Sequence, residues 1–397
     1  MKDTNNGKSA MQNRPHNAKP RVLITGKAYD PHIGGIETVM QQVAEGMKPY
    51  ANVSVLTCRD SAGLAQKDRV RGIRVYRCGS LGTFASCPLS LDYISAFRRK
   101  VMVSDVVELH LPFPLADLAC ILSGYQGRVV VAWHSDIVRQ KKMLVLYRPL
   151  MHALLRRADA IIVATQAHID CSPDLYKYHE KCIVIPYGID ASLYDAALRI
   201  PILQDRLHSK TAKKILFVGR LVYYKGVDVL LEAFAALPES VNCELFLAGT
   251  GVLEEQLKTR AQELGVADRV HFLGRRMDAD LRAAFADCDL FVLPSVANSE
   301  AFGIVQLEAM VYGKPVINTA LPTGVPLVSV HGETGLTVPP SDAEALSNAM
   351  ELLLRDDELR MQYGKAARRR VLEQFDLQTI LAKTRCVLLR NTRRKNR

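Results

Sequence analysis

Short apolar runs alternate with stretches of helical periodicity along most of the chain. In the first half the apolar runs are rich in Val and Ile and almost uninterrupted, which is typical of strands buried on both faces of a parallel sheet. Helical periodicity follows in residues 36–47 and 142–157. The predicted strands of this half are residues 21–25, 53–57, 73–77, 105–109, 128–133, 160–164 and 182–186.

The second half of the chain repeats this scheme. Its predicted strands are residues 214–218, 243–248, 270–273, 290–294 and 315–318. Its predicted helices are residues 227–234, 253–264, 279–286, 303–312, 342–354 and 357–375. Repeated units of strand and helix favour a pair of doubly wound α/β domains.

The same pattern predicts the domain organisation. We expect a disordered tail over residues 1–20, a first domain over 21–195, a linker over 196–212 and a second domain over 213–375. The basic segment 376–397 is expected to pack back towards the first domain. In doubly wound folds ligands bind beyond the carboxyl ends of the strands, so the residues that follow each strand are the candidates for function.

Charge is distributed unevenly over the 397 residues. The net charge of +11 resolves into +3 for residues 1–20, +6 for 21–190, −6 for 191–365 and +8 for 366–397. A basic chain invites a nucleic-acid partner, but we find no RNP, helix-turn-helix or zinc-finger pattern, and aromatic residues make up 7%. No nucleic-acid partner is therefore expected.

Composition excludes further classes. A hydrophobic fraction of 48% with 23% charged residues is that of a globular protein. No run of about 18 apolar residues is present, and the first residues lack the apolar core of a secretory signal. Nine cysteines without a CxxC pair indicate reduced thiols in the cytosol, so neither disulfides nor a structural zinc are expected.

Two segments after strands of the first half carry candidate chemistry. Gly34-Gly35 opens a helix, where the backbone can approach a ligand and the first N–H groups can bind an anion; a tight turn explains it equally. The segment is not a G-x-G-x-x-G fingerprint, which disfavours a nicotinamide cofactor. His134 directly follows a strand, where it could donate to a substrate hydroxyl or phosphate, or cap the next helix together with Asp136.

The second half opens with two cations around one turn. Arg220 and Lys225 bracket the segment between a strand and a helix. Arginine offers a planar fork for phosphate oxygens and lysine a mobile point charge, so together they suit a leaving diphosphate. The alternative is a solvated basic turn without function.

The segment from Ser295 to Met310 holds the densest set of candidates. A strand ends at Pro294, Glu300 lies in the loop, and the amides of Phe302, Gly303 and Ile304 could hold a phosphate at the start of a helix. Glu308 lies four residues after Ile304 on the same face, where a carboxylate could accept both hydroxyls of a ribose. Alternatively, Glu300 merely favours the helix dipole and Glu308 faces solvent.

Taken together, these motifs resemble those of a known family. Glu300 and Glu308 are separated by seven residues with Phe302-Gly303 between them, and this spacing looks like the signature of glycosyltransferase family 4 in its retaining GT-B enzymes. Gly219-Arg220-Leu221 with Lys225-Gly226, Gly34-Gly35 and Gly332–Pro340 are similar to the family's other motifs and stand in the same order. The resemblance covers roughly residues 21–375.

The resemblance implies a GT-B fold, with two Rossmann-like domains facing a central cleft. It implies that Arg220 and Lys225 bind the diphosphate of a nucleotide-sugar donor and that Glu300 binds hydroxyls of the transferred sugar. His134 would face the sugar and the reaction centre. These four residues are the expected catalytic group.

Donor binding is the second role that the resemblance implies. Glu308 would bind the ribose, the amides of Phe302, Gly303 and Ile304 the phosphate and sugar, and Arg275 would lie near the base. Gly34 and Gly35 would line the diphosphate and the acceptor side.

The resemblance also implies a mechanism. The sugar becomes oxocarbenium-like as the diphosphate departs, and the two cations with the helix amides stabilise the leaving anion. The acceptor attacks from the face that the diphosphate leaves, and a phosphate oxygen takes its proton. Members of the family usually work without a metal, and no DxD triplet occurs here, so no metal and no cofactor are expected.

His134-Ser135-Asp136-Ile137-Val138, followed by Arg139–Lys142, is similar to bacterial mannosyl- and rhamnosyltransferases of O-antigen and exopolysaccharide assembly. This similarity favours a GDP-sugar donor over a UDP-sugar and an acceptor glycan on a polyprenyl diphosphate. Basic clusters in the first half, including Arg98–Lys100, suggest peripheral contact with an anionic membrane on its cytoplasmic face.

Several alternatives stay open on the sequence. The basic stretches of the first half could equally be solvated ends of domain helices. A UDP-hexose-dependent transferase of the same fold is the closest rival hypothesis. A sugar-nucleotide epimerase or glycosyl phosphorylase, and a non-catalytic partner that binds a sugar nucleotide, are the others.

Overall fold

A computed structural model describes residues 18–32, 34–84, 87–136, 141–194, 200–276 and 278–390. It divides into two compact units. Unit 1 comprises the described residues up to Pro186 together with those from Gln378 onward, and unit 2 is the continuous stretch Tyr187–Leu377. Most of the predicted tail, residues 1–17, lies outside the described residues.

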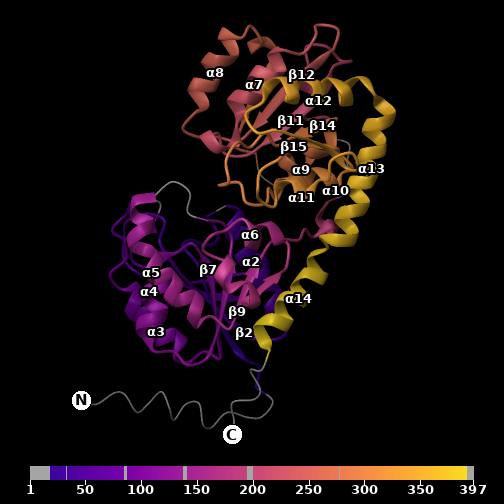
Figure 1. The fold of residues 1–397 in the computed structure, drawn as a ribbon. Coiled ribbons are helices and arrows are strands. Elements are labelled where there is room, and N and C mark those ends of the chain that lie inside the picture. Colours follow the sequence, from indigo (N-terminus) through magenta and orange to yellow (C-terminus); the bar gives the residue numbers. More distant parts are fainter. Residues whose placement is uncertain are drawn as a thin grey trace, which may run out of the picture. The chain divides into compact units, whose positions relative to one another are not determined.

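Unit 1 is built on an eight-stranded sheet (Figure 1). Its order is β10-β9-β8-β7-β1-β2-β4-β3, and β3 alone of these pairs antiparallel, at the edge of the sheet. The chain moves outward from β1 in one direction and then returns to start at β7 on its other side, so the switch point of the sheet lies between β1 and β7. The strands are β1 (Arg21–Thr25), β2 (Asn52–Cys58), β3 (Gln66–Val70), β4 (Ile73–Cys78), β7 (Val106–Leu111), β8 (Arg128–Trp133), β9 (Ala160–Val163) and β10 (Cys182–Val184).

Helices cover both faces of this sheet (Figure 1). One apolar core joins β7 and β8 to three helices, α3 (Tyr93–Val101), α4 (Pro114–Ser123) and α5 (Lys141–Arg157). A second core joins β1 and β2 to α2 (Gly35–Met47) and to α14 (Leu377–Leu389). A short hairpin, β5 (Thr83–Phe84) with β6 (Cys87–Pro88), precedes α3, and α6 (Gln166–Asp170) follows β9.

Helix α14 contributes the end of the described chain to unit 1. Leu388 is fully buried, and Arg128 donates a hydrogen bond from Nε to the carbonyl of Val387 at 3.0 Å. A β-carbon on Gly46 of α2 would come within 2.5 Å of Leu381, so α2 and α14 pack closely at this glycine. Unit 1 is therefore assembled from two separate parts of the chain.

Unit 2 is built on a six-stranded, wholly parallel sheet. Its order is β13-β12-β11-β14-β15-β16, which is the 3-2-1-4-5-6 order of a Rossmann sheet. The order reverses between β11 and β14, so the carboxyl ends of these two strands form the switch point. The strands are β11 (Lys213–Val218), β12 (Cys243–Ala248), β13 (Val270–Gly274), β14 (Leu290–Val292), β15 (Val316–Thr319) and β16 (Gly335–Val338).

The helices of unit 2 also form two layers (Figure 1). Helices α7 (Val227–Ala235), α8 (Glu254–Glu263) and α12 (Ala343–Arg355) share one apolar core with β11, β12 and β14. On the other face α9 (Asp278–Asp287) packs Phe285 against Phe291 of β14, with 5.6 Å between the ring centroids. The remaining helices are α10 (Val305–Val311), α11 (Val325–Val328) and α13 (Asp357–Gln374).

The segment before β11 belongs to unit 2. Leu203 is fully buried, and the N–H groups of Leu203 and Gln204 donate to the carboxylate of Asp287 at 2.7 and 2.9 Å. No helix that the described residues form combines the length and the apolarity that a membrane span requires.

Candidate functional site

Two loops meet at the switch point of unit 2. One follows β11 and carries Arg220 and Lys225; the other follows β14 and carries Glu300. Because β11 and β14 are paired, these loops leave the same edge of the sheet side by side. The N–H of Val296 donates to the carbonyl of Tyr224 at 2.9 Å and joins the two loops directly.

Lys225 and Glu300 form an ion pair across the two loops. Lys225 Nζ lies 2.5 Å from Glu300 Oε2, and both residues are 8% exposed. Ser295 Oγ donates to the same carboxylate oxygen at 3.2 Å. Hydrogen-bonded charges of this kind are held in place, so a ligand arriving here meets a preformed pair of opposite charges.

Gly226 allows the two loops to approach each other. Its φ is +62°, and a β-carbon at this position would lie 2.2 Å from the carbonyl oxygen of Pro294. Both the left-handed backbone and the close approach require a residue without a side chain. The structure therefore accounts for both residues of the Lys225-Gly226 pair. Lys225 forms the ion pair with Glu300, and Gly226 lies against the carbonyl of Pro294.

Arg220 lies at the surface of the same edge. Its Nη2 donates to the hydroxyl of Tyr224 at 2.9 Å, and the residue as a whole is exposed. The ammonium of Lys225 is 5.7 Å from the centre of the same tyrosine ring. Both predicted cations therefore lie next to Tyr224, with Arg220 exposed and Lys225 buried.

The loop after Glu300 is anchored by an aromatic side chain. Phe302 is 2% exposed and packs edge-to-face against Tyr187, with 4.9 Å between centroids, and against Phe375 at 6.1 Å. Gly303 has φ +71°. Within the described chain, the N–H groups of residues 302–304 donate to no protein acceptor, and α10 begins at Val305 rather than at the predicted Gly303.

A network of buried amide side chains holds the backbone of this loop in place. The sequence analysis did not predict it. Gln306 and Asn318 are both fully buried, and Asn318 donates to Gln306 Oε1 at 2.9 Å. Gln306 donates to the carbonyl of Phe302 at 3.1 Å, and Thr319 donates to the carbonyl of Ser295 at 2.6 Å. The signal available in the sequence was a polar residue in each of two otherwise apolar segments.

Glu308 is half-buried on α10. Its Oε1 accepts a hydrogen bond from the hydroxyl of Tyr194 at 3.0 Å. Burial raises the pKa of Glu308 to about 7, against the lowering effects of the Tyr194 hydroxyl and the nearby Arg282 guanidinium. A carboxyl group with this pKa changes its charge near neutral pH.

Arg275 is exposed directly after β13. Strand β13 lies at the edge of the sheet, two strands away from β11. Of the predicted residues of unit 2, Arg220, Lys225 and Glu300 therefore come together at the switch point, whereas Arg275 follows an outer strand.

Gly34 and Gly35 lie at the start of α2 in unit 1. Gly34 is extended and its carbonyl accepts the N–H of Thr38 at 2.9 Å, as predicted for the opening of a helix. A β-carbon at Gly34 would meet the carboxylate of Glu37, the acidic residue of the first turn.

His134 directly follows β8 and is 4% exposed. Its Nε2 is 2.8 Å from Nδ1 of His110, a buried residue of β7, and the two rings stack at 5.0 Å. Burial, followed by the neighbouring His110 and His168, holds the pKa of His134 well below its usual range. His134 is therefore a neutral imidazole at physiological pH.

Glu108 continues this buried group. Its Oε2 is 3.7 Å from Nε2 of His110, and both residues are almost fully buried. Sequence reasoning missed His110 and Glu108 because they lie inside a strand rather than after it. Their only signal was the presence of two ionisable residues in the apolar run of β7.

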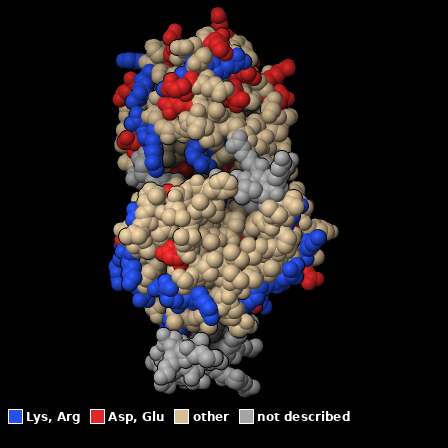
Figure 2. Space-filling model, turned by 90° about the vertical axis from the view of Figure 1, so that its left-hand side faces the viewer, with Lys and Arg blue, Asp and Glu red and all other residues tan. Residues whose placement is uncertain are grey.

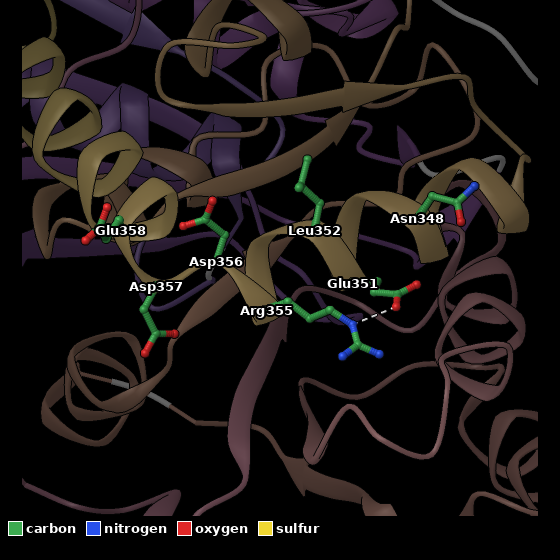
Figure 3. A pocket seen from close by; sticks show the side chains of 7 residues that line it. All are labelled: Asn348, Glu351, Leu352, Arg355, Asp356, Asp357 and Glu358. Atoms are coloured by element: carbon green, nitrogen blue, oxygen red, sulfur yellow. Dashed lines mark hydrogen bonds and ion pairs between the residues drawn. The ribbon is translucent and has the colours of Figure 1, made fainter.

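Two surface hollows of unit 2 contain none of the predicted catalytic or donor-binding residues. One lies at the junction of α12 and α13, where Arg355 pairs with Glu351 at 2.7 Å (Figure 3). Its acidic lining is unsuited to an anionic ligand; it consists of Asn348, Glu351, Leu352, Arg355, Asp356, Asp357 and Glu358. The second hollow lies along α13 beside Glu333 and Arg369.

The switch-point loops supply two cations and a paired carboxylate, and α10 adds a carboxyl group, Glu308, that ionises near neutrality. This set suits a ligand that combines phosphate groups with hydroxyls, and the fold places it where Rossmann sheets bind nucleotides. Two Rossmann-like units with such a set at one switch point agree with a glycosyltransferase of the GT-B type. The chain belongs to the family of group 1 glycosyl transferases, whose model matches residues 200–370, and the glycosyl transferase 4-like domain model matches residues 34–188.

Curated relatives match nearly the whole chain. The D-rhamnosyltransferase WbpZ of Pseudomonas aeruginosa is 36% identical over 358 residues, covering 89% of this chain and 92% of the relative. O-antigen chain mannosyltransferase C of Escherichia coli is 32% identical over 361 residues, covering 89% and 94%. The chain is thus related to a D-rhamnosyltransferase and an O-antigen chain mannosyltransferase, and it is an enzyme that transfers a sugar from a nucleotide-sugar donor.

A solved structure has the same fold. Anabaena HepE in complex with UDP matches with a TM-score of 0.76 at 22% identity, covering 93% of this chain and 99% of that one. The predicted GT-B architecture of two Rossmann-like, doubly wound domains is confirmed.

Proposed function

We propose that the enzyme transfers a hexose, mannose or a related sugar, from a GDP-sugar to a lipid-linked glycan in bacterial surface polysaccharide synthesis, with retention of anomeric configuration. The observation that carries this proposal is the similarity over nine tenths of the chain to a D-rhamnosyltransferase and an O-antigen mannosyltransferase. A polyprenyl diphosphate is the proposed carrier of the acceptor. The complex of HepE with UDP supports the rival donor, a UDP-hexose.

In this proposal the switch-point loops bind the donor. Lys225, positioned by Glu300, and Arg220 neutralise the diphosphate as it leaves. The amides of residues 302–304 supply further N–H donors. The leaving anion is stabilised by fixed groups, so no metal is needed.

The sugar and nucleoside have separate partners. Glu300 keeps its second carboxylate oxygen for sugar hydroxyls while Oε2 holds Lys225. Glu308 accepts the ribose hydroxyls in its ionised form, and Arg275 lies near the base.

Unit 1 supplies the acceptor side. His134 is neutral, so it acts as a hydrogen-bond donor to the sugar rather than as a cation. Gly34 and Gly35, at the start of α2, line the diphosphate and the acceptor side. The acceptor attacks from the face that the diphosphate leaves, and a phosphate oxygen takes its proton.

We further propose that unit 1 lies against the cytoplasmic face of the membrane. The hairpin before α3 exposes Leu81, Phe84 and Leu91 at 67%, 61% and 85%, and the exposed Arg98 and Arg99 follow on α3. Figure 2 shows Lys and Arg side chains along the lower edge and the sides of unit 1, around a largely uncharged face. Apolar side chains beside cations suit an anionic leaflet.

Donor choice is tested by thermal shift with GDP and with UDP. A nucleotide that binds the folded state raises the melting temperature, and the tighter one raises it more at equal concentration. We expect the larger shift with GDP, and its reduction in Glu308→Ala. A larger increase of the melting temperature with UDP than with GDP would identify the donor as a UDP-hexose.

The acceptor and the stereochemistry are tested by transfer. Purified enzyme with each candidate donor and a set of lipid-linked saccharides should give a product whose new linkage has the anomeric configuration of the donor. An inverted linkage contradicts the retaining mechanism. Turnover without an acceptor, or dependence on free phosphate, would indicate an epimerase or a phosphorylase.

A further inference from the structure

A second cluster of polar side chains lies at the opposite end of the sheet of unit 2. Glu244 and His271 are the second residues of β12 and β13, at their amino ends, whereas the switch-point loops follow the carboxyl ends. His271 is paired with Phe246, so Glu244, two residues earlier, lies on the same face of the sheet. His208 comes from the segment before β11.

The two imidazoles converge on one carboxylate oxygen. Glu244 Oε2 is 2.6 Å from His271 Nε2 and 3.3 Å from His208 Nδ1. The three atoms that can bind a metal, one from each residue, all lie within 4.8 Å of one another. They come from three separate segments of the chain, which only the fold brings together.

The carboxylate is oriented by the backbone. Its other oxygen, Oε1, accepts the N–H groups of His208 at 2.8 Å and Ser209 at 3.3 Å. Oε2 is thereby left to face the two histidines. The Glu244 side chain is only 3% exposed, and a buried carboxylate held in this way cannot turn away to solvent.

The histidine rings are supported as well. His271 stacks on Phe246, with 4.5 Å between centroids and 14° between the planes, and His208 stacks on His271 at 5.6 Å. Fixed ring planes are the usual support of a metal site, because they set the direction of the nitrogen lone pair. The His208 side chain is 67% exposed, which provides an entry path from solvent.

We propose that His208, Glu244 and His271 bind one divalent transition-metal ion, with zinc as the ion that their chemistry favours. Two imidazole nitrogens and one carboxylate oxygen suit zinc, whereas Ca²⁺ and Mg²⁺ prefer oxygen ligands. Zinc bonds of about 2.0–2.1 Å place tetrahedral ligand atoms about 3.3 Å apart. The distance from Oε2 to His208 Nδ1 already has this value, and His271 has to withdraw by a few tenths of an ångström.

The site is independent of the proposed sugar transfer. It holds the segment around His208 against the amino ends of β12 and β13, so its effect is on the stability of unit 2. A water molecule from the exposed side of His208 completes a tetrahedral shell. Zinc bound here joins three segments of the chain in the folded state and is lost on unfolding.

The test uses the full-length enzyme, free of any histidine tag and stripped of metal with a chelator. Calorimetric titration with Zn²⁺ should show one equivalent bound, and a saturating excess should raise the melting temperature by about 5 °C. Co²⁺ should give the strong visible absorption of a tetrahedral site. His208→Ala should lose all three signals, and its exposed side chain makes this variant the least damaging to the fold.

A matched control separates this site from surface histidines. His179 is exposed and its ring bonds only to the carbonyl of Tyr176 among the described residues, so His179→Ala should bind zinc like the wild type. Glu244→Gln, which keeps the shape of the side chain, should bind zinc at least tenfold more weakly. Failure to saturate at millimolar Zn²⁺, or binding that survives His208→Ala combined with His271→Ala, overturns the proposal.

Discussion

The ion pair of Lys225 with Glu300 gives the first prediction, because removing one member leaves the other charge buried. Lys225→Ala should lower kcat/KM by about 100-fold or more through loss of the cation. It should also destabilise the fold by about 3 kcal/mol through the unpaired carboxylate. Steady-state kinetics and thermal unfolding measure the two effects separately.

A matched variant distinguishes the two losses. Lys214 pairs with Asp287 at 2.9 Å, is similarly buried and lies at the amino end of β11. Lys214→Ala should therefore lose stability and keep kcat. In Lys225→Ala combined with Glu300→Ala, part of the stability should return while activity stays low. A fully active Lys225→Ala removes this residue from the site.

The pKa of Glu308 gives a prediction of pH dependence. The pKa is raised to about 7, so the group is protonated below that pH and ionised above it. In the proposed role, the ionised carboxylate of Glu308 accepts hydrogen bonds from both ribose hydroxyls. The affinity for the nucleotide sugar should therefore rise about tenfold from about pH 6 to about pH 8. Glu308→Gln cannot ionise and should bind weakly at all pH values. A parallel pH profile for wild type and variant contradicts this role.

Pairings between distant residues were not predictable from the sequence. The residue types at positions 220, 225, 300 and 308 indicated anion and hydroxyl binding, but the contact between Lys225 and Glu300 depends on strand order. The same holds for His110 of β7 with His134 directly after the neighbouring strand β8, 24 residues further along the chain. A residue next to a strand end can be recognised from the sequence, whereas the residue it contacts depends on the order of the strands in the sheet.

At the scale of elements, Gly226 sets the contact between the two switch-point loops. Gly226→Ala should lower the melting temperature because a left-handed alanine costs about 1 kcal/mol and its β-carbon meets the Pro294 carbonyl. Gly265→Ala is the control. Its φ is +69° with no atom within 4 Å, so it carries the backbone cost alone.

The difference between the two glycine variants measures the steric contact. Gly226→Ala should be the less stable of the two and should also lose activity, because the loop carrying Glu300 is displaced. Equal melting temperatures would mean that the loops adjust without strain. Equal activities would mean that their spacing does not matter for transfer.

Most strands buried on both faces were predicted within one or two residues, because continuous runs of Val and Ile are uncommon outside such strands. Helix α4, which begins with Pro114, was missed because it is apolar on nearly all sides and short. The segment of α14 was expected to pack back towards the first domain but was not expected to be a helix, because Lys and Arg residues interrupt the apolar pattern of Ile380, Val387 and Leu388. Charged residues on the exposed face of a helix make its buried apolar residues harder to recognise in the sequence.

At the scale of the whole molecule, the apolar hairpin of unit 1 gives a prediction about membranes. Leu81→Ser combined with Phe84→Ser should lower sedimentation with anionic vesicles several-fold. Val252, 90% exposed on unit 2, is the matched control, and Val252→Ser should bind vesicles like the wild type. Vesicle binding that is unchanged in the hairpin variant would remove this surface from the membrane proposal.

Helix α14 has a consequence for the order in which the enzyme becomes complete. Unit 2 is one continuous stretch of chain, whereas the core of unit 1 closes only with Ile380, Val387 and Leu388. During synthesis, unit 1 is therefore the first unit to emerge from the ribosome but can complete its core only after unit 2 has been made. A nonsense mutation just before residue 378 would spare every residue of the proposed donor site and still leave unit 1 with an open apolar face, so the folding of unit 1 depends on the synthesis of α14.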